Sequence, residues 1–540
     1  MRRTLFLLVA ACGASASPVG NVRFANQAPV WRVNDRVDTP KKPQEIPFDR
    51  HLYHFDSYYL QMNRGLGLDR DRRAQGINAL DEVPDSTWFT NRIGIREVTL
   101  DEIKRGPGDG VAPDAHFPWT IKSGKEGGTA PGFVVEDARG VKFLLKFDQK
   151  HAPEVETGAD VIVSRLLWAA GYNVADDHVV YFKRGDLKLA PDAYYKTYDA
   201  KHELDMARVE RQLAKVSLGK DGRIRGLASV FVEGKPLGGG PRLGVREDDP
   251  NDRIPHELRR DLRGQAPLFA WLSHTDMKED NTLDTWVEDP ANPKVHYVKH
   301  FLIDFGNALG TQARVRQRPY LGYQYDVDFA EMLPSLLSLG IHRQPWEGRI
   351  DPALPGVGLY AVNDYSPAKW KPNTFGQLPL LEADRFDQYW GAKLVAKFTR
   401  EQIAAAVSAA KFTDPRASAY LVDTIYARAR KTAQHWFRLV NPIDELRVEG
   451  ASVCFTELAL SYGLERGATR FTVSGFDGNG VATGGRQQIT TDTAGRACAA
   501  IPAAAYTILR VESSRGMPGT LIHVARAADG TARLVGIHRL

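Results

Sequence analysis

The feature that most constrains the fold is a switch of hydrophobic period between residues 119 and 171. Apolar residues at strand-like spacing predict three short β-strands, at 119–122, 133–136 and 141–147. A Gly-rich loop at 124–132 separates the first two strands, and Asp137–Gly140 predicts a tight turn before the third. The chain therefore starts a β-rich, hairpin-like region here.

A helix is predicted directly after these strands. Its apolar residues recur at the 3.6-residue spacing that puts them on one face, and Gly171 is a natural stop. This face consists of Val155, Ala159, Ile162, Val163, Leu166 and Ala170. Strands followed by an amphipathic helix indicate an α+β fold. Because 540 residues exceed the size at which one hydrophobic core stops growing, we expect two or three domains.

The rest of the chain divides into regions that differ in amino-acid composition and hydrophobic pattern. Residues 18–115 are rich in Pro, Asp, Arg and aromatic residues, which predicts an irregular wrapping segment with short helices. Other expected elements are strands at 179–182 and 230–232, a mostly helical insertion at 185–225, a Gly-rich linker at 234–240, helices at 256–275 and 380–440, and a hairpin at 282–303. Short strands between Gly, Thr and Ser turns predict an all-β, sandwich-like domain at 445–540.

Residues 1–17 are expected to direct export. A basic head with Arg2 and Arg3 precedes the apolar run Leu5–Ala11, which is too short to span a bilayer but long enough for a signal-peptide core. The run ends in Val9-Ala10-Ala11-Cys12, which resembles the lipobox of bacterial lipoproteins. This resemblance implies a lipid anchor on Cys12 and a place in the bacterial periplasm or at the outer membrane. The alternative is ordinary secretion with cleavage after Ala16, which discards Cys12.

The cysteine count bears on the cellular compartment of the protein, and the charge count bears on the kinds of partner it binds. The chain holds three cysteines, and cleavage or lipidation at Cys12 leaves Cys454 and Cys498, for which we predict a disulfide in an oxidising compartment. Two unpaired buried thiols are the alternative. Lys and Arg number 71 against 66 Asp and Glu, a formal net charge of +5, so charge gives no case for nucleic-acid binding.

Three short motifs stand apart from this background. Lys146 lies near the end of the strand predicted at 141–147. The octet His274–Asn281 follows an apolar run and reads H-x-D-x-K-x-x-N. Asp304 opens an Asp-Phe-Gly tripeptide 23 residues after Asn281. Each motif alone is ordinary, but their order along the chain fits one signature set.

In this order the motifs resemble those of the protein-kinase-like superfamily, over residues 116–440. The resemblance implies a bilobal fold with a β-rich N-lobe at 116–235 and a helical C-lobe at 236–440. Divergence from ordinary Ser/Thr kinases points to the atypical branches, which include HipA-like, CotH-like and phosphatidylinositol-kinase-like proteins. Catalysis in such folds rests on positioning the substrates and on neutralising phosphate charge.

The resemblance implies a role for each motif residue. Asp276 would accept the proton of an acceptor hydroxyl or orient that hydroxyl, and Lys278 would lie near the transferred phosphoryl group. Lys146 would hold the α- and β-phosphates of ATP. Glu156 would pair with Lys146 from the following helix, and Glu154 is the competitor for that pairing.

The same resemblance assigns the metal and the phosphate loop. Asn281 and Asp304 would hold Mg²⁺ or Mn²⁺, which prefer oxygen ligands. A loop containing Gly124, Gly127 and Gly128 would cover the phosphates with backbone N–H groups. This loop departs from the G-x-G-x-x-G pattern, so the resemblance is weakest there.

These residues predict an exported kinase-like phosphotransferase that moves a phosphoryl group from Mg·ATP to a hydroxyl of a protein or small molecule. Adenylyl transfer through the same residues is a second reaction to consider. Thr275 replaces the Arg that commonly pairs with a phosphorylated activation loop, so we expect no control of that kind. Because the periplasm is not expected to hold ATP, the alternative is an inactive kinase-like lipoprotein that acts as a binding or scaffold module of the cell envelope.

Overall fold

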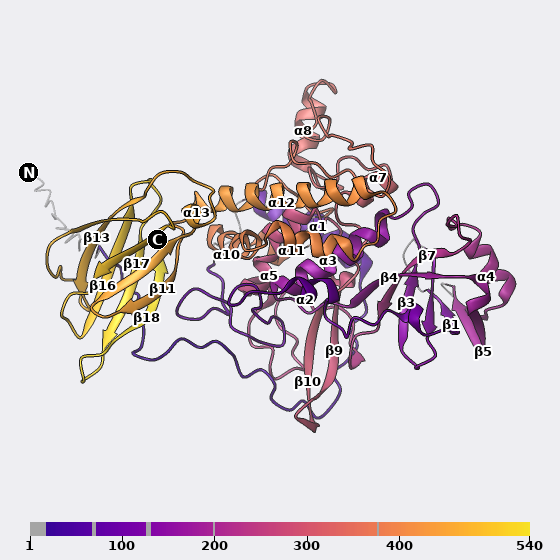
Figure 1. Ribbon diagram of the computed structural model, residues 1–540, viewed down its shortest axis with the longest axis horizontal. Coiled ribbons are helices and arrows are strands. Elements are labelled where there is room, and N and C mark those ends of the chain that lie inside the picture. Colours follow the sequence, from indigo (N-terminus) through magenta and orange to yellow (C-terminus); the bar gives the residue numbers. More distant parts are fainter. Residues whose placement is uncertain (1–17, 67–71, 126–130, 198–199, 375–376) are drawn as a thin grey trace, which may run out of the picture. The chain divides into compact units, whose positions relative to one another are not determined.

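The computed structural model describes residues 18–66, 72–125, 131–197, 200–374 and 377–540. It shows a mixed α+β protein with several sheets and helices, so the expected fold class is confirmed at this level (Figure 1). The chain forms two compact units. The larger unit comprises Val30–Asn78 and Glu82–Leu439, and the smaller comprises Val440–Leu540, Ala79–Asp81 and the described residues up to Pro29.

A seven-stranded sheet forms the β-rich part of the larger unit. Its strands are β1 (Trp119–Gly124), β2 (Gly132–Glu136), β3 (Lys142–Lys146), β4 (Asp176–Phe182), β5 (Leu187–Lys196), β6 (Lys201–Glu203) and β7 (Ile224–Val230). Their order is β4-β7-β3-β2-β1-β5-β6, and all neighbours are antiparallel except β1 and β5. On β3, strand alternation buries Phe143 and Leu145 on one face and puts Leu144 and Lys146 on the other.

The structure corrects three predictions in this region. The stretch 185–225, predicted to be mostly helical, contains β5 and β6 and a single α-helix, α4 (Met206–Leu213), among its described residues. β5 keeps one face in solvent, and the polar residues on that face mask the strand period. The strand predicted at 230–232 lies at Ile224–Val230, and the predicted linker at 234–240 contains the short strand β8 (Lys235–Pro236).

The larger unit also contains eleven further α-helices among its described residues. They are α1 (Arg50–Gly65), α2 (Leu100–Arg105), α3 (Val155–Ala170), α5 (Arg260–Arg263), α6 (Gln265–Leu272), α7 (Thr311–Val315), α8 (Phe329–Leu337), α9 (Leu378–Leu381), α10 (Arg385–Ala396), α11 (Arg400–Ser408) and α12 (Pro415–Phe437). The predicted apolar face of α3 is confirmed, since all six residues are buried. α3 ends at Gly171, where φ is 135° and a Cβ would lie 2.2 Å from the Phe89 ring, so only glycine fits.

A hairpin brings two of the motifs together. Strands β9 (Thr282–Asp289) and β10 (Asn292–Leu302) pair antiparallel, as the sequence predicts for 282–303. Their register places Leu302 opposite Thr282, and the Ile303 N–H donates to the Asn281 carbonyl over 3.0 Å. The end of the octet therefore lies beside the start of Asp-Phe-Gly because of strand pairing.

The smaller unit is rich in β-structure, as predicted for the chain after Pro442. Its strands are β11 (Ile443–Glu449), β12 (Ser452–Glu457), β13 (Arg470–Asp477), β14 (Gln487–Thr490), β15 (Arg496–Ala500), β16 (Tyr506–Ser513), β17 (Thr520–Arg526) and β18 (Ala532–Arg539), and a short helix is α13 (Leu458–Ser461). They form two sheets, β11-β12-β15 and β14-β13-β16-β17-β18. Ile443 and Phe455 of the first sheet share one core with Phe471 and Leu509 of the second.

The two remaining cysteines lie in this unit. Cys454 on β12 and Cys498 on β15 are directly opposite in the antiparallel register, and their sulfur atoms are 2.14 Å apart. The predicted pairing is thus the one in the structure.

Replacing both cysteines by alanine should destabilise the smaller unit alone. The bridge closes a loop with a sequence separation of 44 residues, which corresponds to about 4 kcal/mol of unfolding free energy in the chain-entropy view. All ten tryptophans precede residue 440, so tryptophan fluorescence reports only on the larger unit. In urea, Cys454→Ala/Cys498→Ala should lower the midpoint of a far-ultraviolet dichroism transition and leave the fluorescence transition in place. Equal dichroism midpoints for the two proteins would contradict this.

Candidate functional site

A cleft of the larger unit has a volume of about 780 Å³, which is within the range of small-molecule sites. Its apolar lining is Leu144, Ala175, Leu227, Val230, Val232, Leu283 and Ile303. Its charged lining is Arg50, Lys125, Lys146, Lys278 and Arg316, with Glu156, Asp160, Asp276, Asp280 and Asp304. One cleft therefore offers an apolar surface for a flat ring and a set of cations and carboxylates for a charged, metal-bound group.

Lys146 is the centre of the charged part. Its Nζ lies 2.9 Å from Asp304 Oδ1 and 3.5 Å from Asp160 Oδ2, and its side chain is 13% exposed. Burial alone would lower the pKa of Lys146, but the two carboxylates outweigh it and raise that pKa. Lys146 is thus a permanent cation that joins β3, α3 and the segment after β10.

Asp160, and not Glu156, pairs with Lys146 from α3. The other oxygen of Asp160 accepts the Phe305 N–H over 3.0 Å, so one buried carboxylate holds both the lysine and the Asp-Phe-Gly backbone. Glu156 lies one helical turn earlier and lines the cleft without an ion pair to Lys146 among the described residues. Glu154 binds the Thr413 backbone N–H over 3.0 Å. The expected Glu156 pairing is therefore corrected.

Asp304 is the carboxylate best placed for a cation. Lys146 lowers the pKa of Asp304 to about 2, although burial opposes this shift, so the group is ionised at neutral pH. Its side chain is 43% exposed, which leaves oxygen within reach of the cleft. Its backbone is left-handed, with φ of 63°, a conformation that Asp tolerates better than most residues.

Asp276 faces the same cleft from the octet. The Asn307 amide donates to Asp276 Oδ2 over 2.8 Å, and Lys278 Nζ lies 3.9 Å from the same oxygen. Asn281 is 2% exposed and donates its amide to the Asp276 carbonyl, so it holds the octet in shape instead of lining the cleft. The sequence therefore located Asp276 and Lys278 in the site but did not identify Asn307.

Packing behind the octet fixes its shape. His274 is buried between the Phe269 and Phe305 rings, with centroids 5.1 and 5.5 Å away, and burial lowers the pKa of His274 to about 4. Tyr53 of α1 donates its hydroxyl to the Met277 carbonyl over 3.0 Å. The segment predicted to wrap the chain thus touches the octet directly.

The glycine loop is only partly described. Gly127 and Gly128 lie outside the described residues. Gly124 ends β1, where a Cβ would lie 3.1 Å from Tyr195 Cβ, so close packing against β5 explains this glycine. Lys125 lines the cleft, and burial, followed by the Lys146 charge, lowers the pKa of Lys125.

Two residues missed by the sequence analysis left recognisable signals. Asp160 is the single acid within the apolar stretch 159–163 of the predicted helix, an unusual place for an unpaired charge. Asn307 follows Asp-Phe-Gly immediately. Neither signal identifies the residue that each one binds, because Lys146 is 14 residues from Asp160 and Asp276 is 31 residues from Asn307 in sequence.

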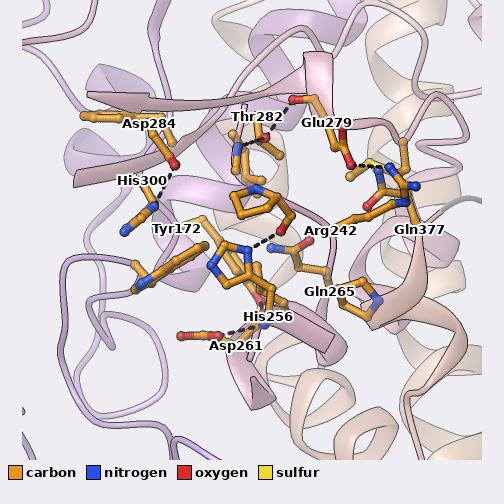
Figure 2. Close-up of a pocket in the computed structure, with 18 of the residues that line it drawn as sticks. Tyr172, Arg242, His256, Asp261, Gln265, Glu279, Thr282, Asp284, His300 and Gln377 are labelled. Atoms are coloured by element: carbon orange, nitrogen blue, oxygen red, sulfur yellow. Dashed lines mark hydrogen bonds and ion pairs between the residues drawn. The ribbon is translucent and has the colours of Figure 1, made fainter. Parts of the chain in front are cut away.

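A second, smaller cavity of about 60 Å³ is lined in part by Met277 and Glu279 of the octet (Figure 2). Figure 2 shows the polar pairs around it: the Asp284 carboxylate with His300 at 2.7 Å, and Arg242 with Glu279 at 2.8 Å. Glu279 belongs to the octet. This cavity is well below the size of ordinary ligand sites, so its pairs serve to hold the octet and the β9–β10 hairpin.

Comparisons with known proteins add no assignment: no protein-family model, curated protein or solved structure matches the chain. Within the described residues, no helix has both the length and the apolarity needed to cross a membrane. Glu449 lies within 4.8 Å of Cys454 and Cys498, but the two sulfur atoms are bonded to each other and are not thiolate ligands.

The raised pKa of the Glu156 carboxyl should make the stability of the protein depend on pH. Burial, followed by the Asp148 charge, raises the pKa of Glu156 from 4.5 to about 7. The folded state therefore holds this proton more tightly than the unfolded state, and the stability present below pH 4.5 is lost as the pH rises to 7, by up to about 3 kcal/mol. The unfolding free energy can be measured by urea titration at pH 5 and at pH 8. From pH 5 to pH 8, it should fall by about 2 kcal/mol more in the wild type than in Glu156→Gln.

Glu154→Gln is the matched control, because Glu154 lies next to the same helix turn but binds Thr413. It should keep the wild-type dependence. Equal pH dependence in wild type and Glu156→Gln would contradict the assignment.

Proposed function

We propose that the larger unit is a bilobal kinase-like phosphotransferase, with the seven-stranded sheet as N-lobe and the helical part as C-lobe. In this proposal the smaller unit is a β-sandwich-like domain, and the chain is exported and lipid-anchored at Cys12 in the bacterial envelope. The reaction moves a phosphoryl group from Mg·ATP to a hydroxyl of a protein or small molecule.

One observation carries the proposal: Lys146, Asp160, Asp276 and Asp304 meet in one cleft although the first and last are 158 residues apart in sequence. Phosphoryl transfer needs a lysine on the phosphates, a carboxylate on the metal and a second carboxylate at the acceptor. Lys146 lies 2.9 Å from Asp304 and 3.5 Å from Asp160. Unrelated surface charges do not form two such close, largely buried ion pairs with one lysine. The apolar lining of the same cleft suits a purine ring.

Magnesium fits the donors at this end of the cleft. The ionised, partly exposed Asp304 carboxylate is a hard oxygen ligand, and Asn307, three residues further on, lines the same cleft and carries an amide oxygen. Asp304 would hold the ion, whereas Asn281, the second ligand implied by the motif, is buried with its amide on the Asp276 carbonyl and does not line the cleft. A bound Mg²⁺ would neutralise phosphate charge.

The remaining residues supply position and proton transfer. The acceptor oxygen attacks the γ-phosphorus, the bond to the β–γ bridging oxygen breaks, and ADP leaves. Asp276 takes the hydroxyl proton, with its carboxylate oriented by Asn307. Lys146 holds the α- and β-phosphates, and Lys125 and Lys278 offset charge on the transferred group.

A scaffold function is the second candidate, and one observation favours it. The N-terminal segment reaches the cleft: Arg50 lines it, and Tyr53 is bonded to the octet. A cleft occupied by its own chain would suit a module that binds a partner without turnover. The volume of about 780 Å³ beside Arg50 favours the enzyme.

The deciding experiment incubates residues 18–540 with Mg²⁺ or Mn²⁺ and ATP labelled separately at the α- and γ-phosphates. We expect label transfer from the γ-position, reduced at least about 100-fold in Asp276→Asn and Asp304→Asn. Asp101→Asn, the same change at an exposed position of α2, should keep wild-type transfer.

Each other outcome has a definite meaning. Transfer from the α-position would establish adenylyl transfer through these residues. No transfer together with no ATP-dependent rise in melting temperature would reject the enzyme and leave the scaffold.

A further inference from the structure

The larger unit exposes a concentrated apolar surface on two helices. On α8 and the turn after it, the exposed fractions are 72% for Leu336, 75% for Leu337, 92% for Leu339 and 86% for Ile341. On α1, the apolar and aromatic residues with exposed fractions of 45–64% include Phe55, Tyr58, Tyr59 and Met62. We call these eight residues, with Phe329, Met332 and Leu333, the α1–α8 patch.

The two helices form one continuous surface. The Tyr58 and Phe329 rings lie 6.3 Å apart. Gln61 donates to the Val327 carbonyl over 2.7 Å and accepts the Phe329 N–H over 3.3 Å. The patch is therefore held together by side-chain contacts between α1 and the start of α8.

The composition of α8 is unusual for a surface helix. It contains Phe, Met and three Leu in the stretch Phe329–Leu337, yet none of its residues is buried. Beyond its first residues, which contact α1, it projects away from the other helices of the larger unit (Figure 1). Soluble proteins rarely expose contiguous apolar surface of this kind unless it binds something.

The charges around the patch favour a lipid surface. Glu331, the only acid on α8, is bonded to His342 over 3.0 Å, and Asp328 at the helix start is buried against Lys371. Arg343, two residues beyond Ile341, has a side chain that is 78% exposed. Its pair with the partly exposed Glu347, at 3.9 Å, is a loose surface contact, so the Arg343 charge stays accessible to headgroups, as in helices that lie in the membrane interface.

The predicted lipid anchor gives such a surface a use. One acyl chain binds a membrane only marginally, and stable attachment takes a second contact. We propose that the α1–α8 patch is this second contact: it inserts its Leu, Ile and aromatic side chains into the interface of an anionic bilayer. The proposal is independent of phosphoryl transfer.

Vesicle binding tests the proposal. Residues 18–540, which lack Cys12, are sedimented with vesicles of phosphatidylethanolamine and phosphatidylglycerol. The wild type should bind, and Leu336→Gln/Leu337→Gln/Leu339→Gln/Ile341→Gln should bind at least tenfold more weakly. Ile95→Gln/Leu218→Gln/Val481→Gln, which changes residues with exposed fractions of 58–62% that are not part of the patch, should bind like the wild type.

Single-site labelling gives a second readout if the fourfold variant does not fold. Residues 18–540 contain Cys454 and Cys498 in their disulfide, so Leu339→Cys and the control Val481→Cys can each be labelled with a polarity-sensitive dye. Vesicles should shift the emission of the Leu339 label to the blue and leave the Val481 label unchanged. No vesicle binding by the wild type, or a wild-type dimer that the fourfold variant abolishes, would overturn the proposal and in the second case identify a self-association surface.

Discussion

The contact on which the rest of the site depends is the buried pairing of one lysine with two carboxylates. Lys146 lies at the end of β3, Asp160 in the middle of α3 and Asp304 just after β10, so three separate elements meet at one charge. Removing one partner of a buried pair typically costs 3–5 kcal/mol, because the remaining charge is left uncompensated. The position of α3 relative to the sheet is therefore tied to the position of the Asp-Phe-Gly segment.

This arrangement also separates two carboxylates by function. Asp160 is 2% exposed and spends its oxygens on Lys146 and the Phe305 N–H. Asp304 keeps nearly half of its side chain exposed and stays ionised through the same lysine. One cation thus stabilises a structural carboxylate and keeps another available for a metal ion.

The sequence predicted the elements that local patterns determine and the motif residues whose spacing is characteristic. The α3 face, the β9–β10 hairpin and the strands of the smaller unit follow from periodicity and turn residues. The residue that pairs with Lys146 could not be predicted in this way, since Glu154 immediately precedes α3 and Glu156 and Asp160 both lie within its first two turns. Which of them faces β3 depends on the rotation of α3 in the core, and that is set by packing over the whole unit. β5 was missed because its polar face resembles a surface helix in composition.

Metal binding tests the central claim most directly, because it depends on Asp304 whatever the acceptor is. Residues 18–540 can be titrated with Mn²⁺ in the presence and absence of ATP while paramagnetic resonance monitors free Mn²⁺. We expect Mn²⁺ to bind the protein when ATP is present. Asp304→Asn should abolish this binding, and Asp101→Asn should preserve it. Two results would contradict the account: equal binding of Mn²⁺·ATP by Asp304→Asn and the wild type, or no binding of Mn²⁺·ATP by either protein.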